Sequence, residues 1–169
     1  MNDALRVRDA TIADLPFLVE SNAAMAFETE HKTLDRAILG RGVAAVFAQP
    51  ARGFYLVAEQ ARHPVGCLLI TYEWSDWRDG DWWWLQSVYV VPAARRRGVF
   101  RALHGCVERR AAERSDVVGL RLYVETENQR AQSTYSELRM RRAPYVMLEA
   151  ALPRAPRDSM AGQPAEDDA

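Results

Sequence analysis

The amino-acid sequence predicts an α/β fold with a mixed central sheet flanked by helices. Three observations predict it. Apolar residues recur at helical spacing in the first third of the chain, and at strand spacing between Phe54 and Val91. A helix with Val99, Leu103 and Val107 on one face follows, and a further strand follows that helix. Strand, helix and strand in succession form a βαβ unit, whose two strands run parallel with a right-handed crossover.

Size and composition suit an ordinary globular protein. The chain has 169 residues, of which 49% are hydrophobic and 27% charged. We expect a single domain over residues 1–152, followed over 153–169 by a flexible or loosely docked tail rich in Pro, Ala, Asp and Glu. The formal net charge of −1 provides no overall basic field, so we expect no nucleic-acid partner.

Several classes of function lack support. No signal region and no apolar run of membrane-spanning length is present, so we expect a soluble cytoplasmic protein with no membrane partner. Cys67 and Cys106 lie among apolar neighbours, as buried cysteines do in a reducing compartment, although a catalytic thiol or a disulfide stays open. The spacing of His31, His63 and His104 matches no metal motif, so no metal is expected.

The N-terminal third is predicted to form one strand and two helices. Leu5–Arg8 alternates apolar and charged residues, as a short strand does. Thr11 and Asp14 have the spacing of a capping box, which would start the first helix. The helical pattern loosens between residues 23 and 31, and a second helix is expected over residues 34–47. Its inward face is predicted to hold Leu34, Ile38, Val43 and Phe47.

Strand periodicity begins at Phe54. Phe54–Glu59 and Val65–Tyr72 are predicted to pair as an antiparallel hairpin, and a polar, aromatic loop over Glu73–Gly80 leads to a third strand over Asp81–Val91. The order after that is a helix, a strand, a helix and a strand. These elements are expected over Val99–Arg114, over Leu120–Val124, after Asn128 as N-cap with Ala131, Tyr135 and Leu138 on one face, and over Tyr145–Glu149.

The stretch from Gln86 to Leu103 carries the clearest chemical signal. A strand breaks at Pro92, three arginines follow, and Gly98 precedes the first turn of a helix. Backbone N–H groups in the first turn of a helix lack intrahelical partners and attract anions, and neighbouring arginines add positive charge. The sequence therefore predicts a phosphate site. A solvated arginine run without a ligand is the alternative.

Here the sequence resembles the GNAT superfamily of N-acetyltransferases. The pyrophosphate loop of that superfamily has Gln or Arg, two residues, Gly, one residue, and then Gly or Ala. Arg95, Gly98 and Phe100 occupy these places, and Phe100 is larger than the usual residue. The superfamily often has an Asn after the next strand and a Tyr one helical segment later, as Asn128 and Tyr135 are here. The predicted order of elements agrees over nearly the whole chain except the tail.

The resemblance implies a GNAT-like acyl-CoA N-acyltransferase fold, in which the parallel strands splay apart, and acetyl-CoA as the acetyl-donor co-substrate. The pantetheine arm would lie along Val88, Tyr89 and Val90, with a backbone N–H near Val90 polarising the thioester carbonyl. Asn128 would bind the arm, and Tyr135 would protonate the departing thiolate, unless it is only a core aromatic residue. The pyrophosphate would lie on Arg95, Arg96, Arg97, Gly98, Val99, Phe100, Arg101 and Ala102.

The acceptor implied by the resemblance is a primary amine of a small molecule or a peptide. Because an alkylamine has a pKa near 10.4, a base or a water chain must help to deprotonate it. Glu28 and Glu73 are the candidate catalytic bases. Carboxylates and tryptophans together suit a cationic amine, although the tryptophans could equally pack under a helix or form a dimer face. The expected acceptor side comprises Glu28, Glu30, Trp74, Asp76, Trp77, Gln86 and Ser87.

Two other functions stay open at this point. One is a non-catalytic acyl-CoA-binding sensor or interaction module, and the other is an arginine-rich interaction protein with no nucleotide ligand. Proteins of the GNAT superfamily are often dimers, which keeps a homodimer open as well.

Overall fold

The computed structural model of the protein describes residues 4–153. Internal contacts divide the chain into two compact units, residues 1–126 and residues 127–169, and we describe each by itself. The expected single domain over residues 1–152 stays a prediction. Of the predicted tail over residues 153–169, residues 154–169 lie outside the described part.

The first unit is built on a five-stranded mixed sheet, as predicted. The strands lie in the order β1-β2-β3-β4-β5. The first three pairings are antiparallel and the β4–β5 pairing is parallel. The strands are β1 (Arg6–Asp9), β2 (Phe54–Gln60), β3 (His63–Ser75), β4 (Gly80–Val90) and β5 (Val117–Leu122).

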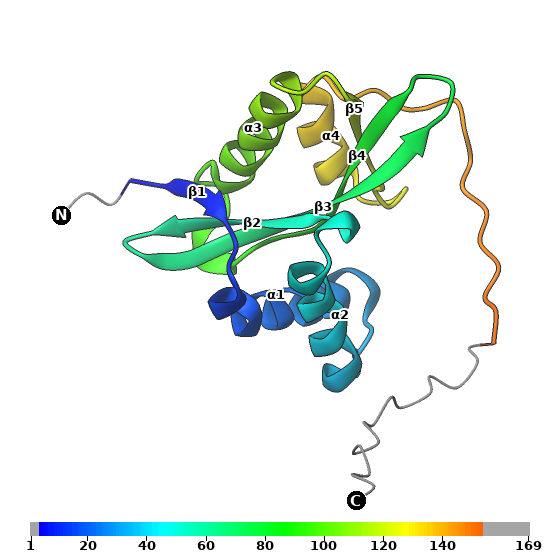
Figure 1. Cartoon of the computed structure of the whole chain (residues 1–169). Helices are drawn as coiled ribbons and strands as arrows, with labels where there is room; N and C mark the ends of the chain where they lie inside the picture. Colours follow the sequence, from blue (N-terminus) through cyan, green and yellow to red (C-terminus); the bar gives the residue numbers. More distant parts are fainter. Residues whose placement is uncertain (1–3, 154–169) are drawn as a thin grey trace, which may run out of the picture. The chain divides into compact units, whose positions relative to one another are not determined.

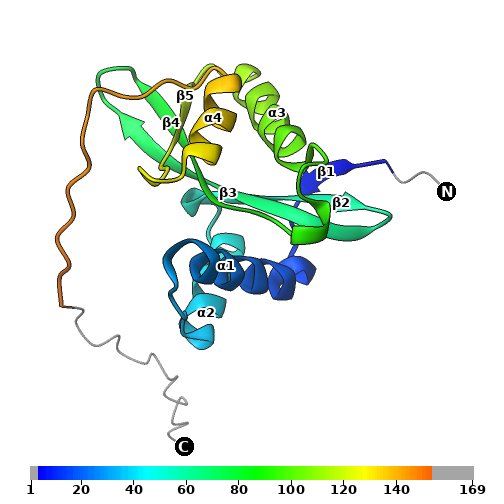
Figure 2. The same ribbon diagram turned by 180° about the vertical axis from the view of Figure 1, so that it is seen from behind.

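Helices cover both faces of this sheet. Figure 1 and Figure 2 show α1 and α2 on one face and α3 on the opposite face. The chain passes from β4 to β5 through α3, which confirms the predicted βαβ unit. The helices are α1 (Leu15–Glu30), α2 (Arg36–Ala48) and α3 (Val99–Ala112), with short 3-10 helices η1 (Ile12–Asp14), η2 (Pro50–Arg52) and η3 (Pro92–Ala94).

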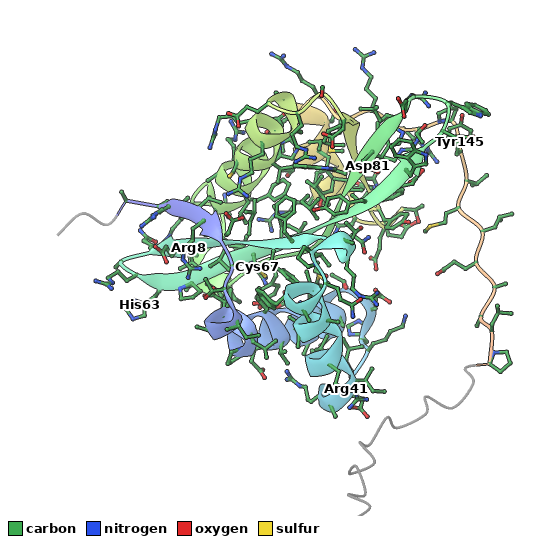
Figure 3. All side chains as sticks on the ribbon, viewed as in Figure 1. Arg8, Arg41, His63, Cys67, Asp81 and Tyr145 are labelled. Carbon is green, nitrogen blue, oxygen red and sulfur yellow. The ribbon has the colours of Figure 1, made fainter. Side chains whose placement is uncertain are left out.

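A buried carboxylate fixes the start of α1 against the sheet. The Asp14 side chain accepts a hydrogen bond of 2.7 Å from the Thr11 backbone N–H, which confirms the predicted capping box. Arg8 of β1 donates to both Asp14 oxygens at 2.8 Å and to Glu59 of β2 at 2.8 Å (Figure 3). Hydrogen bonding from Arg8 holds the pKa of Asp14 below its usual value.

Two apolar cores lie on the two faces of the sheet. In β2, Leu56 and Ala58 face the core under α3, while Tyr55 and Val57 face the core under α1 and α2. This alternation follows from the two-residue period of a strand. It fixes which side chains of each strand can reach which helix.

The alternation changes phase within β4. Trp83 and Leu85 face the α3 core, and so do Val88 and Val90. Odd-numbered residues therefore face α3 before Ser87, and even-numbered residues face it afterwards.

A β-bulge causes this change. Cys67 of β3 pairs with Tyr89, whereas Leu69 pairs with Gln86, so two residues of β4 lie opposite the single residue between them on β3. Ser87, the first of the two, has a left-handed φ of 49°. The bulge turns the side chain of Tyr89 toward α1 and α2.

Two details of the first unit differ from our predictions. Residues Glu73–Ser75 continue β3 instead of entering the predicted loop over Glu73–Gly80, because they pair with Trp82, Asp81 and Gly80 of β4. The connecting turn is therefore only residues 76–79. Ile38, predicted to face inward, is exposed, and Leu39 packs on the core in its place.

The segment between residues 23 and 31, where the sequence pattern loosens, stays helical. The helix α1 continues to Glu30 and ends at His31, which adopts a left-handed conformation. Glu28 is therefore held on a helix.

The second unit contains one helix within the described residues, α4 (Gln129–Glu137). The side chain of Asn128 accepts a hydrogen bond of 3.0 Å from the Ala131 backbone N–H, which confirms the predicted N-cap. The predicted strand over Tyr145–Glu149 is wrong, because these residues form no regular secondary structure. A β-prone run becomes a strand only when its backbone pairs with a neighbour, and sequence preference alone does not provide one.

Gly53 and Gly42 provide a matched test of the fold. Gly53 has a φ of 142°, and a Cβ there would lie 1.9 Å from the carbonyl oxygen of Ile70, whereas a Cβ on Gly42 in α2 would meet nothing within 4 Å. We expect Gly53→Ala to lower the free energy of unfolding by about 3 kcal/mol or more. Gly42→Ala should raise it by about 0.5–1 kcal/mol, because alanine is the better helix former. Urea unfolding of both variants measures this, and equal effects would contradict the packing described here.

Candidate functional site

The parallel strands β4 and β5 separate halfway along β4. Their pairing covers Asp81–Leu85 on β4 and Val117–Leu122 on β5. Residues 86–90 of β4 pair with β3 alone. The backbone of β4 therefore presents an open edge after Leu85, as predicted for a splayed pair.

The backbone of Val90 points toward this open edge. The N–H of Val91 donates to Val65 of β3 at 3.0 Å. Because successive residues of a strand direct their backbone groups to opposite sides, the N–H and C=O of Val90 point away from β3. The N–H of Val90 can therefore donate to a ligand along the edge.

The N-terminus of α3 lies one short connection after this edge. Gly98 is its N-cap, with a left-handed φ of 80°, and Arg96 has a φ of 63°. The hydrogen bond from Ala102 to Gly98, at 2.9 Å, begins the helix, so the N–H groups of Val99, Phe100 and Arg101 have no partner within it. A Cβ at Gly98 would meet nothing within 4 Å, so φ requires glycine there and the space beside it is open.

Phe100 is the departure from the small residue usual in the loop. Its ring lies 5.9 Å from that of His104, one turn further along α3. Both residues belong to the helix, so the large side chain packs along α3.

Glu28 and Tyr89 meet beside the open edge. The Tyr89 hydroxyl donates to one oxygen of Glu28 at 3.1 Å, and Arg95 donates to the other at 2.6 Å. Burial and the Glu28 carboxylate raise the pKa of Tyr89, which therefore stays protonated as a donor. The structure thus brings a predicted catalytic residue next to the predicted donor edge.

Glu73 lies at the opposite end of the sheet. It pairs with Trp82, and eight residues of β4 separate Trp82 from Val90, about 26 Å along a strand. Both Glu73 oxygens are engaged, one by the Trp84 indole and one by Arg121, each at 2.5 Å. Figure 3 labels Asp81 at this end of β4, away from Cys67, which pairs with Tyr89. The structure does not bring Glu73 to the open edge.

The other expected acceptor residues also divide into two places. Gln86 and Ser87 lie at the bulge, where the Gln86 amide donates to Thr71 at 2.6 Å. Glu30 lies at the end of α1 and pairs with Lys32 at 2.5 Å. The remaining three are in or next to the turn between β3 and β4, where Trp74 is 60% exposed, Trp77 is 85% exposed and Asp76 accepts from the Trp77 backbone.

A buried polar group behind the bulge was missed from the sequence. Ser21 and Asn22 of α1 are buried, and they bond to the side chains of Cys67 and Tyr55 respectively. Tyr55 also bonds to Ser87 at the bulge. Their position next to Leu18 in the helical period was the available signal, since a polar residue in a buried stripe needs a partner.

Arg121 was missed as well. Its guanidinium lies 4.1 Å from the centre of the Trp82 ring and pairs with Glu73. The alternation of β5 indicates only that this side chain faces one side of the sheet.

In the second unit, Asn128 and Tyr135 lie on one helical segment. The Oδ1 atom of Asn128 caps α4, which leaves its Nδ2 group as a donor. Burial raises the pKa of the Tyr135 hydroxyl above its usual value, so it is protonated at neutral pH.

Two further classes of site were searched for between residues 4 and 153. No helix in that range has the length and apolar character needed to cross a bilayer. No cluster of three or more His, Cys, Asp or Glu side chains in the same range could hold a metal ion.

Comparison with known proteins agrees with this geometry. The model of the acetyltransferase (GNAT) family matches residues 15–139. A possible acetyltransferase from Clostridium difficile 630 is 38% identical, with 89% of this chain and 99% of that chain covered and a TM-score of 0.84. No curated protein sequence matches the chain.

More distant solved structures share the fold. An aminoglycoside N-acetyltransferase, in complex with CoA, is 14% identical over 89% of this chain and 97% of its own, with a TM-score of 0.71. An acetyltransferase from Clostridium acetobutylicum, with acetyl-CoA, is 15% identical over 86% of this chain and 96% of its own, with a TM-score of 0.70.

The two cysteines are expected to be unreactive in the native protein. Cys67 and Cys106 are both free and buried, and burial raises the pKa of the Cys67 thiol to about 11. Because the thiolate is the reactive form, a thiol reagent such as DTNB at pH 8 should modify neither residue in the folded protein and both in urea. Rapid reaction of one thiol in the native state would contradict this and reopen a catalytic thiol.

Proposed function

Because the chain belongs to the acetyltransferase (GNAT) family, we propose that it transfers an acetyl group to a primary amine of a small molecule or a peptide. The acetyl donor is acetyl-CoA, the co-substrate of this family. The observation that carries the proposal is the open edge of β4, where the Val90 N–H points outward and the Glu28 carboxylate is held on the adjoining strand residue.

The described residues of the first unit fit the donor. The open edge over residues 86–90 can pair with an extended amide-containing arm as a further strand would. The unpaired N–H groups of the first turn of α3, together with Arg96 and Arg97, suit a pyrophosphate. When bound, the thioester supplies an activated acetyl group. The Val90 N–H then donates to its carbonyl oxygen and stabilises negative charge there.

We assign the acceptor amine to Glu28. Its carboxylate is 39% exposed and is held by Tyr89 and Arg95, so it can bind an ammonium group in a fixed direction. An amine must lose a proton before it attacks, and Glu28 accepts this proton directly or through water. Gln86 and Ser87 complete the near part of the acceptor side. Glu73, Trp74, Asp76 and Trp77 are too far along the hairpin to take part in this step.

We assign the departing thiolate to Tyr135. Its position seven residues after Asn128 is the pattern on which the family resemblance rests. A protonated hydroxyl can donate to a thiolate and make it a better leaving group. The Asn128 Nδ2 group would bind the arm of the donor.

Two parts of the wider prediction belong here as well. A cytoplasmic location and a homodimer both stay predictions. No membrane or nucleic-acid partner enters the proposal.

Calorimetry with acetyl-CoA, followed by turnover assays on a panel of amines, tests the function. The panel should contain aminoglycosides, because one protein of this fold is an aminoglycoside N-acetyltransferase, together with polyamines and peptides. Micromolar binding with CoA release on one class of amine is the expected result. Binding without turnover on any amine would favour a non-catalytic acyl-CoA-binding protein, and no binding would reject both.

Replacing Tyr135 by Phe separates its acid role from a packing role. Tyr135→Phe keeps the ring and removes the hydroxyl, so kcat should fall about a hundredfold while the Kd for acetyl-CoA changes by less than about twofold. Stopped-flow or steady-state assays of CoA release measure this. An unchanged kcat would show that Tyr135 is only a packing residue.

Comparing Glu28→Gln with Glu73→Gln decides between the two candidate bases. Glu28→Gln should lower kcat/KM for the amine about a hundredfold, since the amide can neither take the proton nor neutralise an ammonium group. Glu73→Gln should lower kcat/KM by less than about threefold, because the residue lies roughly 26 Å away along β4. A larger loss for Glu73→Gln, at an unchanged melting temperature, would place the acceptor at the other end of the sheet.

A further inference from the structure

The three arginines before α3 do not act as one group. Arg96 and Arg97 are exposed and make no hydrogen bond or ion pair within residues 4–153. Arg95 is half-buried and directs its guanidinium back to β4 and α1. The backbone explains the difference. Arg95 ends η3 in an extended conformation, with φ −64° and ψ 152°, whereas Arg96 has a φ of 63° and starts the turn into α3.

The Arg95 guanidinium joins the two groups that the proposed reaction needs side by side. Its Nε atom donates to the Val90 carbonyl at 2.9 Å, and its Nη2 atom donates to Glu28 Oε2 at 2.6 Å. The guanidinium also lies 5.5 Å from the centre of the Tyr89 ring. Because the donors of a guanidinium are planar and rigid, these contacts fix the carboxylate relative to the backbone of Val90.

The second oxygen of Glu28 is held from the same strand. Tyr89 donates to Oε1 at 3.1 Å, so two residues on either side of Val90 bind one carboxylate. Glu28 lies in the last turn of α1, where a half-exposed glutamate otherwise samples several rotamers. The two donors together select one of them.

We infer that Arg95 is a positioning residue for the acceptor: it holds the Glu28 carboxylate beside the Val90 amide and does not bind the donor phosphate with its side chain. The inference rests on the proposed function, in which Glu28 receives the amine. It replaces the prediction that all three arginines serve the pyrophosphate. The guanidinium already bonds to Glu28 and to Val90, so Arg96 and Arg97 are the side chains left for the anion.

Arg95→Gln and Arg96→Gln form a matched pair that tests this division. Both remove one positive charge from adjacent positions of the same loop. Arg95→Gln should raise the KM for the amine about tenfold and leave the Kd for acetyl-CoA within about twofold, because only the contact with Glu28 is lost. Arg96→Gln should do the reverse. Arg95→Lys should restore part of the amine KM, since an ammonium group can reach Glu28 but cannot bond to Val90 at the same time.

Glu28→Gln supplies the second arm of the test. If Arg95 acts through Glu28, adding Arg95→Gln to Glu28→Gln should raise the amine KM no further, so the two effects are not additive. Melting temperatures of all variants identify any loss of folding. A rise in the Kd for acetyl-CoA on Arg95→Gln that matches the rise on Arg96→Gln, with an unchanged amine KM, would overturn the inference.

Failure of the proposed function would look different. In that case the wild-type protein transfers no acetyl group to any amine, and the kinetic arm does not apply. The contact can still be tested by a double-mutant cycle of Arg95→Gln and Glu28→Gln on the free energy of unfolding. A measurable coupling supports the inferred contact between the two side chains, and its absence would overturn it.

Discussion

The β-bulge in β4 controls which side chains reach the open edge. Without the extra residue at Ser87–Val88, the two-residue period of the strand would place Tyr89 on the α3 side of the sheet, away from Glu28. Tyr55, which bonds to both Asn22 and Ser87, ties the bulge to α1 through buried polar side chains. The geometry of the bulge and the position of the carboxylate on α1 are therefore supported by the same contacts.

The open edge and the anion-binding turn are close together because the connection between them is short. Only residues 91–98 separate the end of β4 from α3. Within that span, η3 turns the chain, and Arg95 folds back onto Val90 before Gly98 starts the helix. A strand edge, a carboxylate and a helix N-terminus are thus assembled largely from consecutive residues, with α1 contributing Glu28 from outside.

Local signals were sufficient to predict most of the fold. Capping by Asp14 and Asn128, the antiparallel hairpin and the βαβ unit depend on neighbouring residues and were confirmed. The bulge was not predicted, because Val88, Tyr89 and Val90 suit a strand in either phase. The partners of Arg95 and Arg121 were also beyond reach, since those pairs join residues 67 and 48 positions apart. The expected strand over residues 145–149 was wrong for the same reason: strand formation depends on a distant partner.

A protein that binds a thioester is exposed to acetylation of its own side chains. Lysine amines and cysteine thiolates are the usual internal targets, and this chain offers few of either. Its only lysine, Lys32, is in an ion pair with Glu30, and both cysteines are buried. The cations of the loop before α3 are all arginines, whose guanidinium groups stay protonated and are poor nucleophiles at neutral pH. The same arginines that suit a pyrophosphate therefore also make the loop chemically inert toward the donor it would bind.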